Sequence, residues 1–171
     1  AYFLINFGGV GNYFLLSKVI EAINIFQQES FFIVTGKLEA HQFLELRKAI
    51  SYSKVKIVET TVNIANLMSQ SQYAIGACGS TVWERFCLGL NSGLIEMAEN
   101  QTPLLNYLTK MNLIDNLGNV NSLTTDDILK LLQNLDLTDA KYSYRKSAIM
   151  NFIDGKGTQR VSDIILEVTN G

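Results

Sequence analysis

Residues 73–84 read YAIGACGSTVWE, an apolar run of six residues that leads directly into small residues and the start of an amphipathic stretch. The apolar run is typical of a buried strand, and the stretch after it is typical of a helix. Gly79, Ser80 and Thr81 are therefore expected at a turn from a strand into a helix. In open α/β sheets, turns at the carboxyl ends of strands are where ligands bind.

The residue types at this turn suit a nucleotide diphosphate. Small residues allow a phosphate to approach backbone N–H groups at the start of the helix, and the carboxylate of Glu84 could accept hydrogen bonds from ribose hydroxyls. A purely structural alternative is a capping box, in which Thr81 and Glu84 bond only the first N–H groups of the helix. The turn alone leaves both interpretations open.

Strand-like and helix-like segments alternate through the whole chain. Strands are expected near 2–7, 31–35, 54–58, 72–76 and 92–96, with a short sixth near 113–117, and helices near 12–28, 39–50, 61–69, 81–89, 100–112, from 124, 138–150 and 157–170. This alternation predicts a Rossmann-like α/β fold, a parallel sheet with helices on both faces. The first and last helices carry regular apolar stripes and should pack on the sheet or on a partner.

Length and composition restrict the class of protein. A chain of 171 residues is expected to form one domain. Its 47% apolar residues and net charge of -2 argue against a disordered chain and against a basic, nucleic-acid-binding surface. No apolar run is as long as a membrane span, which needs roughly eighteen residues. Cys78 and Cys87 lack metal-ligand spacing, so both are expected to be buried thiols in a reducing cytoplasm.

A second glycine-rich loop, residues 7–12 (FGGVGN), joins the first expected strand to the first helix. Its glycines allow a tight turn and close approach of a ligand to the backbone. The loop lacks the third glycine of a dinucleotide-binding fingerprint, where Phe14 stands, and lacks the Gly-Lys-Ser/Thr of a P-loop. Gly8 and Gly9 therefore fit either a nucleotide contact or a plain turn.

Two amides, Asn100 and Gln101, follow the fifth expected strand on the same ligand-binding edge. Their structural alternative is that Asn100 caps the next helix and Gln101 is exposed in its first turn. Residues 153–157 (IDGKG) are expected to form a plain turn before the last helix. The single histidine, His41, is expected on a surface helix, away from the ligand edge and from any role as a general base.

Together these segments resemble the carboxyl-terminal, donor-nucleotide-binding half of GT-B-type enzymes. The resemblance is greatest to the UDP-sugar hydrolases of the pseudaminic acid pathway and to SpsG-like surface-polysaccharide proteins, and a weaker similarity extends to MurG-type glycosyltransferases. It runs the length of the chain and is carried by NFGG (6–9), VTG (34–36), NLM (66–68), IGACGSTVWE (75–84), LGL (88–90), NQ (100–101) and DGKG (154–157) with Arg160. The GSTVWE and NQ segments are its most specific part. Gln72 and Asn91 depart from the family pattern, which has Asp and Pro at these places.

The resemblance implies a site and a reaction. It implies contacts with the diphosphate by Gly8, Gly9, Gly79, Ser80 and Thr81, with the ribose hydroxyls by Glu84, and with the sugar by Asn100 and Gln101. The implied reaction is hydrolysis of a UDP-sugar in bacterial surface-glycan biosynthesis, such as that of nonulosonic acids for flagellin glycosylation. No motif requires a metal or another cofactor.

The resemblance also implies that the chain is not complete as an enzyme. In the family the histidine that acts as general base lies in the amino-terminal half, so we expect no catalytic residue in this chain. That half, or a separate partner subunit, would supply it, and we expect it to dock on an exposed apolar surface near residues 1–7 and the last helix, 157–170. Two alternatives stay open, the donor-binding half of a two-subunit glycosyltransferase and a stand-alone nucleotide-sugar-binding domain.

Overall fold

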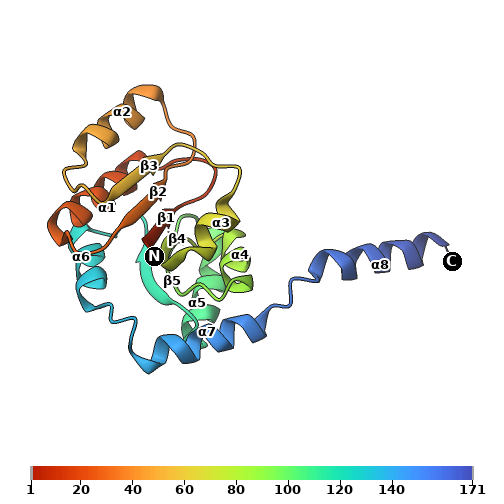
Figure 1. Ribbon diagram of the computed structural model, residues 1–171. Coiled ribbons are helices and arrows are strands. Elements are labelled where there is room, and N and C mark those ends of the chain that lie inside the picture. Colours follow the sequence, from red (N-terminus) through yellow and green to blue (C-terminus); the bar gives the residue numbers. More distant parts are fainter. Residues whose placement is uncertain (1, 171) are drawn as a thin grey trace.

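A computed structural model describes residues 2–170, and its centre is a six-stranded parallel sheet (Figure 1). The strands are β1 (Tyr2–Asn6), β2 (Phe31–Val34), β3 (Val55–Val58), β4 (Ser71–Ala77), β5 (Ser92–Glu96) and β6 (Asp115–Asn119). Their order across the sheet is β3-β2-β1-β4-β5-β6. The order of the strands therefore reverses between β1 and β4, where Asn6 is in register with Gly76. This is the strand order of a doubly wound, Rossmann-like sheet, as the alternation in the sequence predicted.

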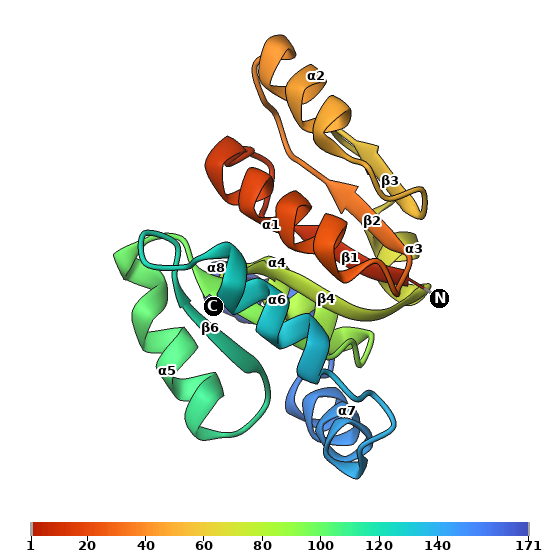
Figure 2. The same ribbon diagram turned by 90° about the vertical axis from the view of Figure 1, so that its left-hand side faces the viewer.

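Helices cover both faces of the sheet. The helices of the described residues are α1 (Tyr13–Phe26), α2 (Ala40–Ala49), α3 (Ile64–Ser69), α4 (Thr81–Cys87), α5 (Thr102–Lys110), α6 (Thr125–Asn134), α7 (Ala140–Phe152) and α8 (Gly157–Asn170), with a short 3-10 turn, η1 (Glu99–Gln101), before α5. One core packs α1, α2 and α6 against one face (Figure 2). The other face is covered by α3, α4 and α5.

Local sequence explains why these elements form. In β1, Phe3 and Ile5 face the α1 core and Leu4 faces the opposite core, as the alternation of a strand buried on both faces requires. The side chain of Asn12 caps α1 by accepting a hydrogen bond from the N–H of Leu15 at 2.9 Å. The predicted sixth strand exists but begins two residues later than expected. Leu113 and Ile114 pack into the core beneath α4 and α5 and do not pair with β5.

A buried polar cluster fastens α7 to the sheet; we call it the Asp115 cluster and define it as Tyr73, Asp115, Tyr142 and Arg145. The carboxylate of Asp115 accepts hydrogen bonds from the Tyr73 hydroxyl at 2.6 Å and from Nη1 of Arg145 at 3.0 Å. The Tyr142 hydroxyl donates a longer one at 3.4 Å. Burial, reinforced by the nearby carboxylate, raises the pKa of Tyr73 well above its usual value, so this phenol stays a donor.

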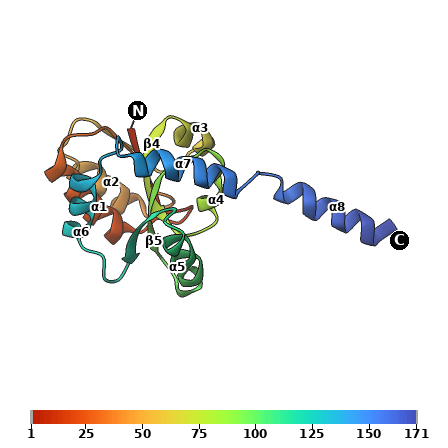
Figure 3. The same ribbon diagram turned by 90° about the horizontal axis from the view of Figure 1, so that it is seen from below.

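The last helix, α8, leaves the body of the molecule (Figures 1 and 3). Its apolar residues Val161, Ile164, Ile165, Leu166 and Val168 are 55–77% exposed. Its apolar stripe predicted that α8 packs either on the sheet or on a partner. Within residues 2–170, α8 does not pack on the sheet. None of the helices in this described part of the chain is both long and apolar enough to cross a bilayer.

Two expectations about exposure need correction. We expected an exposed apolar surface at the start of the chain, but β1 is a central strand and Leu4 and Ile5 are fully buried. We also expected both cysteines to be buried. Cys78 is buried, whereas Cys87 is exposed near the end of α4, where the helix turns that position away from the core. His41 lies on α2 and is exposed, as predicted.

Candidate functional site

The two glycine turns lie side by side at the point where the strand order reverses. The loop after β1 begins at Phe7 and the turn after β4 begins at Cys78, and these strands are neighbours. At this edge there is a pocket of about 280 Å³, which we call the switch-point pocket. It is lined by Asn6, Gly8, Gly9, Val34, Gly36, Glu59, Thr60, Thr61, Ile64, Thr81 and Glu84. The fold thus brings Gly8, Gly9, Thr81 and Glu84 together.

The other predicted site residues lie beside this pocket or away from it. Gly79 and Ser80 form the turn before α4 but do not line the pocket. Gln101 lies close to this turn, because a Cβ atom built on Gly79 would be 3.7 Å from its Nε2. Its Oε1 accepts a hydrogen bond from the N–H of Met97 at 2.9 Å, so Gln101 is half-buried and not the exposed first-turn residue of our structural alternative. Asn100 is exposed and does not cap α5.

The capping-box alternative for Thr81 and Glu84 is wrong. Helix α4 begins at Thr81 and its N-cap is Ser80, whose side chain makes no capping bond. The sequence pattern is therefore one residue out of step with the helix, and a box at this spacing cannot form. Within residues 2–170, neither the Thr81 hydroxyl nor the Glu84 carboxylate has a hydrogen-bond partner, and both residues line the switch-point pocket.

The loop after β1 is held rigidly, yet one of its glycines has no structural reason to be glycine. Two backbone bonds, Gly11 N–H to Lys37 O (3.0 Å) and Lys37 N–H to Gly9 O (2.9 Å), fasten the loop to the one after β2. Gly8 has a φ of +112°, which favours glycine. Gly9 has no such φ, and a Cβ atom built on it would meet nothing within 4 Å. Gly9 also lines the switch-point pocket, so the fold leaves open space beside a residue of the pocket.

Several residues of the pocket were missed by the sequence analysis. Glu59, Thr60 and Thr61 follow β3, and Asn6 ends β1 with its amide donating to the carbonyl of Val34 at 3.3 Å. The available signal was their position: each is at or just after the carboxyl end of a predicted strand, and in a parallel sheet these ends share one edge. The pocket therefore presents two carboxylates, those of Glu59 and Glu84, which suit hydroxyl-bearing groups such as ribose.

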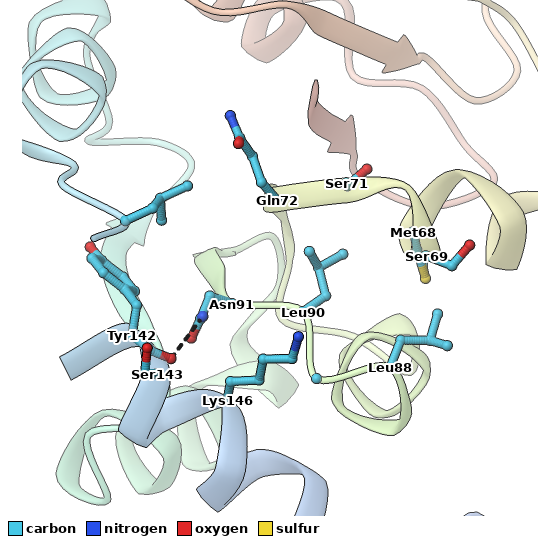
Figure 4. Close-up of a pocket in the computed structure, with 12 residues that line it drawn as sticks. Met68, Ser69, Ser71, Gln72, Leu88, Leu90, Asn91, Tyr142, Ser143 and Lys146 are labelled. Atoms are coloured by element: carbon cyan, nitrogen blue, oxygen red, sulfur yellow. Dashed lines mark hydrogen bonds between the residues drawn. The ribbon is translucent and has the colours of Figure 1, made fainter. Parts of the chain in front are cut away.

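A second pocket, of about 300 Å³, lies at the opposite edge of the sheet (Figure 4). It is formed by residues at the start of β4, by the loop before β5 and by α7. The side-chain amide of Asn91 donates to the backbone oxygen of Tyr142 at 3.1 Å, which ties the loop to α7 (Figure 4). This pocket contains no predicted site residue and lies at the amino ends of the strands, where parallel sheets do not present their ligand sites.

Comparisons with known proteins agree with this fold. No family model matches the chain. SpsG, a spore coat polysaccharide biosynthesis protein of Bacillus subtilis (strain 168), is 26% identical over 171 residues, which cover 96% of this chain and 50% of SpsG. The structure of MurG from Acinetobacter baumannii superposes with a TM-score of 0.81 at 16% identity, over 97% of this chain and 49% of MurG.

A third similar protein is Os79 from O. sativa, whose structure was solved in complex with UDP. The superposition has a TM-score of 0.70 at 14% identity and covers 87% of this chain and 35% of Os79. The chain thus spans half, or less, of the length of each of these proteins. The fold is a Rossmann-like half of a GT-B fold, and SpsG, the relative similar in sequence, is a polysaccharide biosynthesis protein.

Proposed function

We propose that this chain is the donor-nucleotide-binding, carboxyl-terminal half of a UDP-sugar hydrolase in surface-glycan (nonulosonic acid) biosynthesis. One observation carries the proposal: at the switch-point pocket the fold assembles a glycine and two side chains that have no structural task there. These are Gly9, Thr81 and Glu84. The likeness to SpsG supports a role in polysaccharide biosynthesis, and the UDP bound by Os79 supports the nucleotide.

In this proposal the pocket separates two kinds of contact. The carboxylate of Glu84 accepts hydrogen bonds from the ribose hydroxyls, since it has no hydrogen-bond partner within the described residues. The backbone at Gly8 and Gly9, together with Gly79, Ser80 and Thr81 across the switch point, takes the diphosphate. The sugar then extends toward Gln101 and Asn100, beyond Gly79.

The histidine base that the resemblance implies is a group that the pocket does not hold. Hydrolysis requires a base within about 3 Å of the attacking water. Histidine is absent from the lining of the switch-point pocket, and His41 is exposed on α2. We therefore infer that the base belongs to an amino-terminal half, which would cover the pocket in the intact enzyme. The fold likeness to MurG favours a second candidate, the donor-binding half of a glycosyltransferase.

The test is a calorimetric titration of the purified chain with UDP, repeated on the variant Gly9→Ala. We expect the wild type to bind UDP and to hydrolyse no UDP-sugar. Gly9→Ala should fold with unchanged or slightly higher stability, because a methyl group has room there, and should bind UDP about tenfold more weakly, or about 1.4 kcal/mol, because that methyl group occupies the space of the phosphate.

Absence of heat with UDP at millimolar concentration would refute nucleotide binding. Turnover of a UDP-sugar by the chain alone would refute its incompleteness. If Gly9→Ala bound UDP as well as the wild type, the phosphates would lie elsewhere than over Gly9.

A second prediction concerns Glu84. Glu84→Gln should weaken UDP binding by about 1.5–3 kcal/mol, the range for a hydrogen bond to a charged group, and should leave the unfolding midpoint unchanged because Glu84 makes no capping bond. The matched control is Glu167→Gln on the exposed face of α8, which makes the same change of charge far from the pocket. UDP made with 2′-deoxyribose should bind the wild type more weakly than UDP does, and this preference should shrink in Glu84→Gln. Equal affinities throughout would count against the ribose contact.

A third prediction concerns α8, whose apolar residues we propose to dock on the amino-terminal half of the intact protein. The chain matches only half of SpsG, and exposed apolar patches of this kind are interaction sites or cause self-association. We expect the isolated chain to self-associate in sedimentation experiments and the double variant Ile164→Ser/Ile165→Ser to be monomeric with an unchanged unfolding midpoint. A monomeric wild type at high concentration would contradict the prediction.

A further inference from the structure

Arg85 is a fully buried cation beneath the switch-point pocket. It lies on α4, next to Glu84, and its exposed fraction is 0%. Within residues 2–170 no carboxylate forms an ion pair with it, in contrast to Arg145, which is paired with Asp115. Burial lowers the pKa of Arg85 to about 10, an effect that the nearby Glu84 partly opposes, so the guanidinium stays charged at neutral pH.

The contacts of Arg85 connect the two turns of the site. Its Nη2 donates to the backbone oxygen of Asn6 at 3.0 Å, and its Nη1 donates to that of Ala77 at 3.4 Å. Asn6 and Ala77 are the last residues of β1 and β4. One guanidinium is therefore hydrogen-bonded to both strand ends from which the glycine turns begin. Its Nε is buried and has no hydrogen-bond partner.

The sheet is built to admit this side chain. A Cβ atom on Gly76, the residue before Ala77, would lie 2.6 Å from Cζ of Arg85 and would also collide with the backbone oxygen of Asn6. The absence of a side chain at this place in a central strand therefore makes room for the guanidinium. A buried charge without a counter-charge costs free energy, which a neutral hydrogen-bond donor to the same two carbonyls would avoid. The carbonyl contacts therefore explain a donor at this place, but they do not explain its charge.

We propose that Arg85 makes the switch-point pocket selective for a diphosphate group, acting as a positioning residue that does not touch the ligand. It does so in two ways. It sets the separation of the Gly8–Gly9 loop and the Gly79 turn, and its charge attracts an anion through a medium of low dielectric constant, where charges act more strongly than in water. The two carboxylates of the pocket, Glu59 and Glu84, make such a charge necessary near the phosphates. This inference rests on the proposed binding of UDP and names the group that the site recognises.

The experiment compares affinities for UDP and UMP in wild type, Arg85→Met and Arg85→Lys, with inorganic diphosphate as a competitor. We expect the wild type to prefer UDP. Arg85→Met should lose about tenfold or more of its UDP affinity and little of its UMP affinity, and inorganic diphosphate should no longer compete. Arg85→Lys keeps the charge but cannot donate to both backbone oxygens in the same way. Its preference for UDP over UMP should therefore lie between those of the wild type and Arg85→Met. Arg145→Met is the control, because it removes the other buried arginine at the far edge of the sheet; its folded fraction should keep the wild-type preference.

The outcomes are separable. If the wild type binds no UDP, the proposed function fails. If it binds UDP and Arg85→Met loses UDP and UMP affinity equally, Arg85 is only structural and the inference is overturned. If Arg85→Met does not fold, the result for Arg85→Lys is the test. A reduced preference for UDP over UMP in Arg85→Lys would support the role of the two carbonyl contacts. A preference equal to that of the wild type would contradict that role.

Discussion

Replacing Arg145 with methionine is expected to lower the free energy of unfolding by about 3–5 kcal/mol, the range for breaking one partner of a buried ion pair. The guanidinium of Arg145 is 4% exposed and its partner Asp115 is 21% exposed. Without Arg145 the carboxylate keeps the Tyr73 hydroxyl but loses its counter-charge. Nε of Arg145 also donates to the backbone oxygen of Asn112 at 3.1 Å, so the anchor of α7 is lost as well. Chemical denaturation of the two proteins measures the difference.

Two controls show whether burial is the cause. The pair of Arg160 and Asp154 has a shorter separation, 2.6 Å, but both side chains are exposed, so Arg160→Met should leave the unfolding midpoint unchanged. In the double variant Arg145→Met/Asp115→Asn no buried charge is left unpaired, and it should be more stable than Arg145→Met alone. Equal losses in Arg145→Met and Arg160→Met would show that burial of the pair has no bearing on its contribution.

Replacing Gly76 with alanine is expected to destabilise the fold by about 3 kcal/mol, at the upper end of the range for overpacking a core. The added methyl group would meet the guanidinium of Arg85 and the backbone oxygen of Asn6. The carbonyl belongs to the neighbouring central strand and cannot move aside, and Arg85 is enclosed on all sides. Denaturation measures the loss, and the same variant should bind UDP more weakly, because the methyl group pushes apart the two turns that Arg85 holds.

The matched control is Gly79→Ala, three residues further along the same segment. There a Cβ atom would meet only Nε2 of Gln101, at 3.7 Å, an ordinary contact. Its free energy of unfolding should stay within about 0.5 kcal/mol of the wild type, as for substitutions outside the core. If Gly76→Ala were as stable as Gly79→Ala, the side chain of Arg85 would have to leave its buried position, and it could then not hold the two glycine turns.

Most elements of the fold could be predicted from the sequence because their signals are local. The apolar alternation of a buried strand, the spacing of a helix and the small residues of a turn all lie within one segment, and the strand and helix positions followed from them. The gathering of Gly8, Gly9, Thr81 and Glu84 in one pocket was also predictable, since these residues follow two strands of a parallel sheet whose carboxyl ends share an edge.

The errors arose where one residue of displacement or one distant contact decides the outcome. The capping box of Thr81 and Glu84, one of two alternatives that the sequence left open, does not form because the helix begins at Thr81 itself. Cys87 was expected to be buried, yet the phase of α4 turns it outward. The beginning of the chain was expected at the surface, yet β1 became the central strand when β2 and β4 paired on either side of it.

The sequence by itself determined the α/β class, the positions of the helices and strands and the residue types available for a nucleotide, because periodicity and turn chemistry act over a few neighbouring residues. Only the tertiary structure decided which of those residues share a pocket, that Gly9 is not needed by the fold, and that Arg85 is buried against Gly76 without a counter-charge. These facts depend on contacts between strands that are far apart in the chain, such as that of Arg85 with Asn6, and no local pattern records them.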